Sequence, residues 1–151
     1  MDVTEIISGL WIGSKKNAHS TNFLTTKHIE VVINCKQMDG AIDRVSGLDN
    51  LRENESMKMY KWLPIVTEYL HTQLKSLKNV LVYCQTGIQR SPTVIASYLI
   101  RYGGINVDTA IEVIRTKRIV AFSTGFNFKK VLLQFQNDLS SEKTDTNKTL
   151  R

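Results

Sequence analysis

The sequence is poor in cysteine and proline and contains no long apolar run. Two of its 151 residues are cysteine and two are proline. The two cysteines, Cys35 and Cys84, cannot form the disulfide framework of a small secreted domain. They favour a reducing compartment, so we expect a cytoplasmic or nuclear protein. No apolar run approaches the length of a membrane-spanning helix. The N-terminal stretch MDVTEIISGLW lacks the basic-then-apolar layout of a secretory signal.

Motifs for binding metals and nucleotides are also missing. The three histidines are scattered and no C-x-x-C pair occurs, so the sequence has no metal-ligand spacing. The nucleotide-binding motif G-x-x-x-x-G-K-[ST] does not occur. The formal net charge of +6 favours anionic partners such as phosphorylated chains, lipid headgroups or nucleic acid, although no long basic run concentrates that charge.

What is present is an alternation of strand-like and helix-like segments, in a chain whose 42% hydrophobic and 23% charged residues suit one soluble domain. Strands are predicted at 9–14, 29–35, 57–65 and 79–84, and helices at 16–28, at 67–77, from Ser91 to Gly103, from Asp108 and from about Gly125. Ser91 and Asp108 are the predicted N-caps. The polar segment 36–56 is interpreted as a surface connection. This order predicts an α/β fold with a central, mostly parallel sheet flanked by helices. We assign residues 1–139 to a single domain and 140–151 to a flexible tail.

The stretch VLVYCQTGIQRSP, residues 80–92, has the parts of a phosphate-binding loop. It lies between a predicted buried strand and a predicted helix, where unpaired backbone N–H groups favour a dianion. Gly87 allows the loop to curl where a side chain would clash. Arg90 can hold two phosphate oxygens with its two-pronged guanidinium.

Cys84 is the candidate nucleophile of this loop. The positive field that binds phosphate also stabilises a thiolate, which is the attacking species. Ser91 can donate a hydrogen bond to the sulfur when the sulfur becomes the leaving group. A lone cysteine at a strand end is more often a small buried hydrophobe, and Cys35 is interpreted in that way. The glycine, arginine and serine that follow Cys84 in register favour chemistry at this cysteine.

These residues resemble the signature H-C-x5-R-[ST] of the dual-specificity branch of the cysteine-based protein tyrosine phosphatases. The resemblance extends over about residues 3–139 and includes EIISGLWIGSKKNA, IEVVINC and RTKRIVAFSTGFNFKKVLLQF. It implies a protein tyrosine phosphatase-like fold and hydrolysis of phosphomonoesters through a phosphocysteine intermediate, without a metal or cofactor. It also implies that Cys84 is the nucleophile, that Arg90 clamps the phosphate and that Ser91 assists release of the thiolate. The loop N–H groups that bind phosphate would come from Gln85, Thr86, Gly87, Ile88 and Gln89.

Two positions depart from the family pattern. Tyr83 stands where the family has a histidine that helps to keep the cysteine pKa low, so we expect a less acidic Cys84 than is usual in the family. The general-acid aspartate of the family follows a motif that YKWLPI resembles, and Thr67 occupies that register. Glu68 is the substitute carboxylate, although it also suits the first turn of a helix. Only nineteen residues, 65–83, separate the proline of this motif from the cysteine, which indicates a trimmed acid loop.

The sequence therefore favours a compact, slow protein phosphatase that acts on phosphotyrosine, with phosphoserine and phosphothreonine as further candidates. Two alternatives stay open, a phosphoprotein-binding module without turnover and an RNA 5′-phosphatase. Retention of Cys84 and Arg90 argues against the first, and the Arg-Ser-Pro sequence after the loop favours protein over RNA. A phosphoinositide substrate is disfavoured because the loop offers no lysine to meet extra phosphates.

Overall fold

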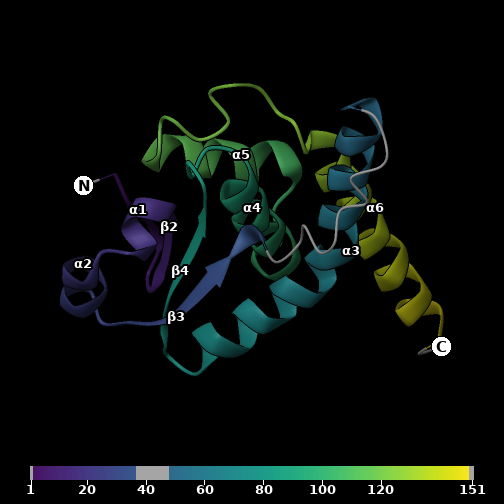
Figure 1. Ribbon diagram of the computed structural model, residues 1–151. Helices are drawn as coiled ribbons and strands as arrows, with labels where there is room; N and C mark the ends of the chain where they lie inside the picture. The colour runs from purple at the N-terminus through teal and green to yellow at the C-terminus, as the bar shows by residue number, and fades with distance from the viewer. Residues whose placement is uncertain (1, 37–47, 150–151) are drawn as a thin grey trace.

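The protein is built around a four-stranded sheet in the residues that the computed structural model describes, 2–36 and 48–149 (Figure 1). Its strands, in sheet order, are β1 (Thr4–Ile7), β2 (Leu10–Ser14), β4 (Asn79–Cys84) and β3 (Ile29–Asn34). β1 pairs antiparallel with β2, whereas β4 lies between β2 and β3 and runs parallel to both. The predicted α/β fold with a mostly parallel sheet is therefore confirmed.

Four of the helices pack together on one side of the sheet. The helices are α1 (Lys15–Ala18), α2 (Thr21–Thr26), α3 (Leu48–Lys75), α4 (Arg90–Gly103), α5 (Val107–Lys117) and α6 (Lys129–Thr149). α4 lies at the centre of this helical layer, in contact with α3, α5 and α6 as well as with β2 and β4. α1 and α2 lie away from these four helices, near β2 and β3 (Figure 1).

Alternation along β2 explains why both faces of the sheet are covered. Leu10 and Ile12 are fully buried and belong to the core beneath the helical layer. Trp11 points to the opposite face, as period-two alternation requires, and meets Phe23 of α2 edge-on with ring centroids 5.5 Å apart. The centre of β4 is apolar on both faces for the same reason, since Val80, Leu81 and Val82 are all fully buried.

The long helix α3 corrects two predictions. The strand predicted at 57–65 is absent, because these residues lie within α3. Residues 48–56 of the predicted surface connection also belong to α3, and 37–47 lie outside the described residues. The apolar side chains decide in favour of the helix, since the buried positions are Met59, Leu63, Val66 and Leu70, at spacings of three and four. Pro64 is accommodated inside the helix, although it removes one backbone donor.

Some predicted helix ends also change. Gln89, not Ser91, is the N-cap of α4, and Asn106, not Asp108, caps α5 by accepting a hydrogen bond from the Thr109 N–H (2.8 Å). Residues 140–149, expected in the tail, continue α6 to Thr149. No helix in the described part of the chain is long and apolar enough to cross a bilayer.

Met57 and Met59 distinguish the observed helix from the predicted strand. On a strand the two side chains would share one face, but on α3 Met59 is fully buried and Met57 is 54% exposed. We expect Met59→Ala to lower the free energy of unfolding by about 2–5 kcal/mol, and Met57→Ala to change it by less than about 0.5 kcal/mol. Urea denaturation measures both values, and equal losses would contradict the helix.

Candidate active site

The candidate site lies at one edge of the sheet, where two parallel strands end. β4 ends at Cys84 and α4 begins at Arg90, so residues 85–89 form the loop between them. Ser14, the last residue of β2, is the sheet partner of Cys84. The backbone N–H of Lys15 then donates to the Gln85 carbonyl (3.3 Å). The start of the loop is therefore fixed by the neighbouring strand as well as by its own.

The Cys84 sulfur is surrounded by hydrogen-bond donors. The backbone N–H groups of Gly87 and Ser91 donate to Sγ over 3.2 Å and 3.4 Å. The Ser91 hydroxyl lies 3.3 Å from the same sulfur. The cysteine is 5% exposed. The structure thus brings together Cys84, Gly87 and Ser91, and Arg90 follows the loop directly.

These donors set the acidity of the thiol. Burial raises the pKa of Cys84, but the Ser91 hydroxyl and the backbone N–H groups of Ser91, Gly87 and Thr86 outweigh burial. The pKa therefore lies below the ordinary value of a thiol. Hydrogen bonds to sulfur favour the thiolate, which is the form in which a cysteine acts as a nucleophile.

Gly87 is the tightest position of the loop. Its φ of +73° is one that side-chain-bearing residues rarely adopt. A Cβ at this position would lie 2.5 Å from Nη2 of Arg118 and 2.8 Å from the Gly13 carbonyl oxygen. Both the backbone conformation and the lack of space for a Cβ therefore explain the predicted need for glycine at this position.

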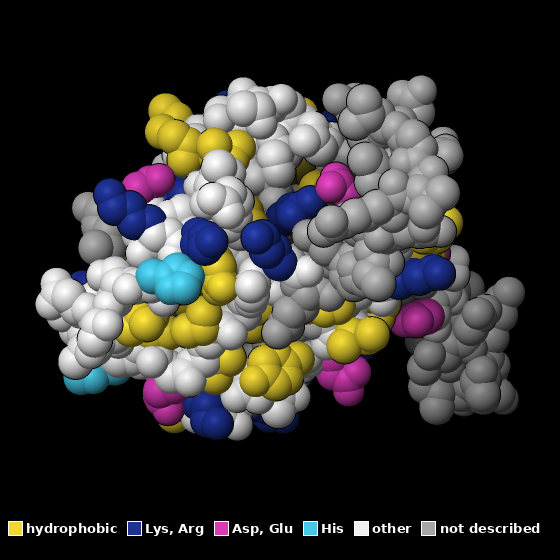
Figure 2. All heavy atoms as spheres, in the orientation of Figure 1, with side chains coloured by type: hydrophobic (Ala, Val, Ile, Leu, Met, Phe, Trp, Pro, Cys, Tyr) yellow, Lys and Arg dark blue, Asp and Glu magenta, His cyan; other side chains and the backbone are white. Residues whose placement is uncertain are grey.

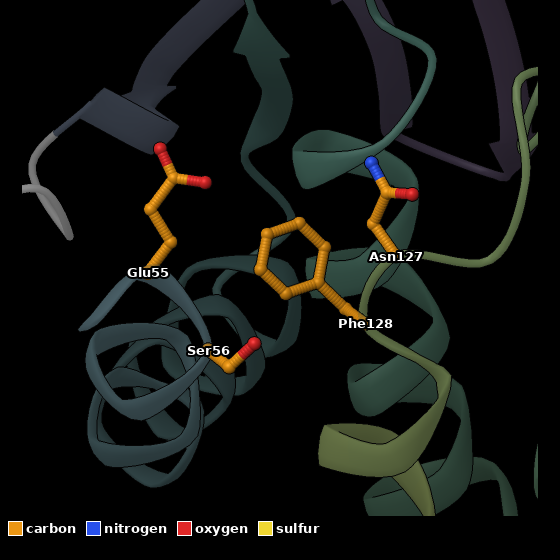
Figure 3. Close-up of a pocket in the computed structure, with 4 residues that line it drawn as sticks. All are labelled: Glu55, Ser56, Asn127 and Phe128. Carbon is orange, nitrogen blue, oxygen red and sulfur yellow. The ribbon is translucent and has the colours of Figure 1, made fainter. Parts of the chain in front are cut away.

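Arg90 is held by a carboxylate that the sequence did not single out. Its Nη2 donates to Oε1 of Glu55 on α3 over 2.8 Å, and the two side chains are 24% and 34% exposed. Glu55 also lines a pocket with Ser56, Asn127 and Phe128, where the Phe128 ring projects between α3 and the start of α6 (Figure 3). Glu55 lies in a segment interpreted as a surface connection, and nothing in its local sequence indicates that it meets Arg90.

Residues 118–125, which follow α5, form hydrogen bonds with the loop. Nε of Arg118 donates to the Gly87 carbonyl (2.9 Å), and the Phe122 N–H donates to the Ile88 carbonyl (2.8 Å). The side chain of Gln89 donates to the Gly125 carbonyl (2.7 Å). Three consecutive loop residues are therefore hydrogen-bonded to residues 118–125.

The two positions that depart from the family pattern, Tyr83 and Thr67, lie on different elements of the structure, β4 and α3. Tyr83 is half-buried on β4, and its hydroxyl has no hydrogen-bond partner among the described residues. Thr67 is buried in α3, and its hydroxyl donates to the Leu63 carbonyl (2.6 Å). Because α3 extends from Leu48 to Lys75, YKWLPI is helical and does not lead into a loop. Glu68 is exposed on the same helix. It lies thirteen residues after Glu55, or about 20 Å along the helix axis, so the structure does not bring it to Cys84.

Replacing Gly87 tests how tightly the loop is built. We expect Gly87→Ala to abolish binding of inorganic phosphate, because the new methyl group displaces either the Arg118 guanidinium or the Gly13 backbone. Gly104→Ala is the matched control, because Gly104 has a similar φ of +68° and a Cβ there meets nothing within 4 Å. That control should retain phosphate binding and lose about 1–2 kcal/mol of stability. Isothermal titration calorimetry measures the binding, and phosphate binding by Gly87→Ala at wild-type affinity would show that the loop tolerates a side chain.

The hydrogen bond from Ser91 predicts a change in thiol acidity. The lowered pKa means that alkylation of Cys84 by iodoacetamide begins at a lower pH than for an ordinary thiol. Ser91→Ala removes the hydroxyl donor that lowers the pKa of Cys84, so its alkylation midpoint should move to higher pH than that of the wild type. Ser97→Ala is the control, since Ser97 is also buried on α4 but donates to the Val94 carbonyl. Coincident profiles for Ser91→Ala and wild type would show that the hydroxyl does not stabilise the thiolate.

Comparison with known proteins agrees with this geometry. The family model described as "Dual specificity phosphatase, catalytic domain" matches residues 10–138. The "Putative tyrosine phosphatase 123R" of Invertebrate iridescent virus 6 is 30% identical over 142 residues, which cover 93% of this chain and 96% of that protein. The tyrosine-protein phosphatase vhp-1 of Caenorhabditis elegans is 30% identical over 146 residues, which cover 91% of this chain but only 22% of that protein.

A solved structure has the same fold. A leucine-rich repeat and phosphatase domain containing protein from Entamoeba histolytica superposes with a TM-score of 0.74 at 17% identity, over 93% of this chain and 94% of that one. The expected protein tyrosine phosphatase-like fold is therefore confirmed. Because the family model matches most of its length, the chain belongs to the dual specificity phosphatase family of cysteine-based protein phosphatases.

Proposed function

We propose that the chain hydrolyses phosphotyrosine in protein substrates through a phosphocysteine intermediate on Cys84. The observation that carries the proposal is the set of donors on the Cys84 sulfur, two backbone N–H groups and one hydroxyl within 3.4 Å. This arrangement favours a thiolate at the floor of an anion-binding loop. Family membership supports protein phosphatase activity, and the loop supplies the chemistry that the activity requires.

The reaction has two displacement steps. In the first, the Cys84 thiolate attacks phosphorus, an S–P bond forms, and the bond to the tyrosine oxygen breaks. The phenolate leaves with the electron pair and takes a proton from solvent. In the second, water attacks phosphorus, loses a proton to solvent and releases inorganic phosphate. The S–P bond breaks, and the Ser91 hydroxyl donates to the departing thiolate.

Arg90 and the loop N–H groups stabilise the charge that shifts between these steps. The transferring phosphoryl group spreads negative charge over its non-bridging oxygens, and preorganised donors aimed at them lower the barrier. Glu55 holds Nη2 of Arg90 before substrate arrives. A phosphate dianion that binds at Nη2 of Arg90 therefore competes with Glu55 for this donor.

The leaving group decides which phosphoesters are good substrates. A general acid contributes about 10²–10⁴-fold, or roughly 3–5 kcal/mol of barrier. With Glu68 far along α3, we propose that the leaving group departs without help from Glu68. Phenolate, from a group with a pKa of about 10, tolerates this far better than a serine alkoxide does.

The surface around the loop suits a phosphorylated substrate. Lys15 and Lys16 follow β2 and Lys36 follows β3, and all three side chains are exposed. These strand ends lie beside the end of β4, because Ser14 pairs with Cys84 and Asn34 pairs with Tyr83. In Figure 2 several lysine and arginine side chains lie close together near the middle of the face shown. Positive charge there raises the local concentration of anionic chains.

Phosphopeptides that differ only in the esterified residue test the proposal. We expect kcat/KM to be at least about 100-fold higher for phosphotyrosine than for phosphoserine in the same peptide. Cys84→Ser should have no turnover, because an alcohol at this position does not replace the thiolate. Glu68→Gln should retain wild-type kcat/KM and pH dependence. Release of inorganic phosphate measures all of these rates.

Cys35→Ala is the control for Cys84→Ser, because it removes the other buried thiol and should keep turnover. Equal rates on the two phosphopeptides would show that a general acid operates after all. No turnover by the wild type, combined with retained binding of orthovanadate, would identify a module that binds phosphoproteins without hydrolysing them.

A further inference from the structure

One buried charge takes no part in the two displacement steps. Arg118, the residue just after α5, is 2% exposed. Its Nη2 is buried and has no hydrogen-bond partner among the described residues. Burying a guanidinium is costly unless its donors are used. The position of Arg118 therefore calls for a reason beyond packing.

Arg118 joins three parts of the chain. Nε donates to the Gly87 carbonyl of the phosphate loop over 2.9 Å. Nη1 donates to the Thr4 hydroxyl of β1 (3.0 Å) and to Oδ1 and the carbonyl oxygen of Asp2 (3.3 Å and 3.4 Å). The Asp2 carboxylate is 71% exposed, so this ion pair offsets little of the cost of burial.

The guanidinium and the reactive sulfur lie on either side of the same glycine. Gly87 gives its carbonyl oxygen to Arg118 and its N–H to Cys84 Sγ. Nη2 lies 2.5 Å from the point where a Cβ of residue 87 would stand. The cation therefore packs directly against the loop, at a residue whose conformation aims an N–H at the sulfur.

We propose that Arg118 is a positioning residue of the phosphatase reaction, one that fixes Gly87 and supplies a buried positive charge to the loop in a chain that has Tyr83 in place of the family histidine. The inference rests on the proposed function for its biological meaning. Its physical content concerns only the loop and the thiol. A cation behind the loop favours both the thiolate and a bound phosphate dianion, because low-dielectric surroundings screen it weakly.

A purely structural role is the competing explanation. Arg118 also ties the end of α5 to β1, and a tie of that kind would affect folding without changing the chemistry of Cys84. A substitution that keeps the charge separates the two roles. Arg118→Lys keeps the positive charge but loses the two-pronged guanidinium, so it preserves the electrostatic effect and loses some of the hydrogen bonds that join α5 to β1.

The test compares Arg118→Met, Arg118→Lys and Arg115→Met. Arg115 is exposed on α5, where its guanidinium lies over the Phe126 ring. Arg115→Met therefore makes the same change of side chain and removes the same charge as Arg118→Met, but at a residue that does not contact Gly87. For each folded variant we measure the pH profile of Cys84 alkylation by iodoacetamide, located by peptide mapping, and the dissociation constant of orthovanadate. Thermal melting followed by circular dichroism reports stability separately.

We expect Arg118→Met to slow alkylation about tenfold at one pH unit below the wild-type midpoint, and to weaken vanadate binding about tenfold or more. Arg118→Lys should recover most of the alkylation profile, and Arg115→Met should match the wild type in both measurements. A folded Arg118→Met with wild-type alkylation and vanadate binding would overturn the proposal. Failure of Arg118→Lys to recover any of the lost thiol reactivity would overturn the electrostatic part of it.

Thr4→Val provides the same test if Arg118→Met does not fold. It removes one anchor of Nη1 and leaves the charge in place, so we expect a smaller shift of the alkylation profile in the same direction. An unchanged profile would contradict the proposal. Neither measurement needs turnover, so a chain that proves unable to hydrolyse phosphopeptides would refute the proposed function and leave the role of Arg118 to be decided on its own.

Discussion

The conformation of Gly87 is the constraint on which the rest of the site depends. At a φ of +73° its N–H points to the Cys84 sulfur while its carbonyl oxygen points to Arg118. One loop residue therefore accepts a hydrogen bond from the Arg118 guanidinium and donates one to the Cys84 sulfur. Gly13 approaches from β2 so closely that no side chain fits at position 87. The backbone conformation at Gly87 therefore sets the geometry of the site to which the side chains of Cys84 and Arg118 contribute.

The sheet and the helical layer hold that geometry with little conformational freedom. Cys84 ends β4, which lies between β2 and β3, and it pairs with Ser14 of β2, so the sheet fixes the position of its backbone. α4 begins immediately after the loop, and Ser91, Pro92 and Thr93 in its first turn are buried. Arg118 and Phe122 donate hydrogen bonds to the loop carbonyl groups of Gly87 and Ile88. The N–H groups of Gly87 and Ser91 donate to the Cys84 sulfur, and donors fixed in this way are the preorganisation on which phosphoryl transfer depends.

Local sequence predicted the parts of this arrangement that are local in the chain. The apolar run of β4, Gly87 and Arg90 lie within one stretch, and the strand, loop and helix form there as expected. α3 was not predictable in the same way, because Met57 and Met59 suggested alternation while the helical spacing of the buried side chains extended over a longer window. The register that leads from YKWLPI to Glu68 assumes a loop after the motif, whereas these residues are helical in the structure. Glu55 and Arg118 reach the loop through tertiary packing, over separations of 35 and 31 residues, and no short motif announces them.

The central claim is that Cys84 forms a covalent bond to phosphorus. The most direct measurement is rapid acid quenching of the wild-type chain during turnover of a phosphotyrosine peptide, with mass spectrometry of its proteolytic fragments. We expect a phosphoryl group on the fragment that contains Cys84, formed and lost within one turnover and absent from Cys84→Ser. Release of inorganic phosphate at the full rate with no labelled cysteine fragment at any quench time would contradict it.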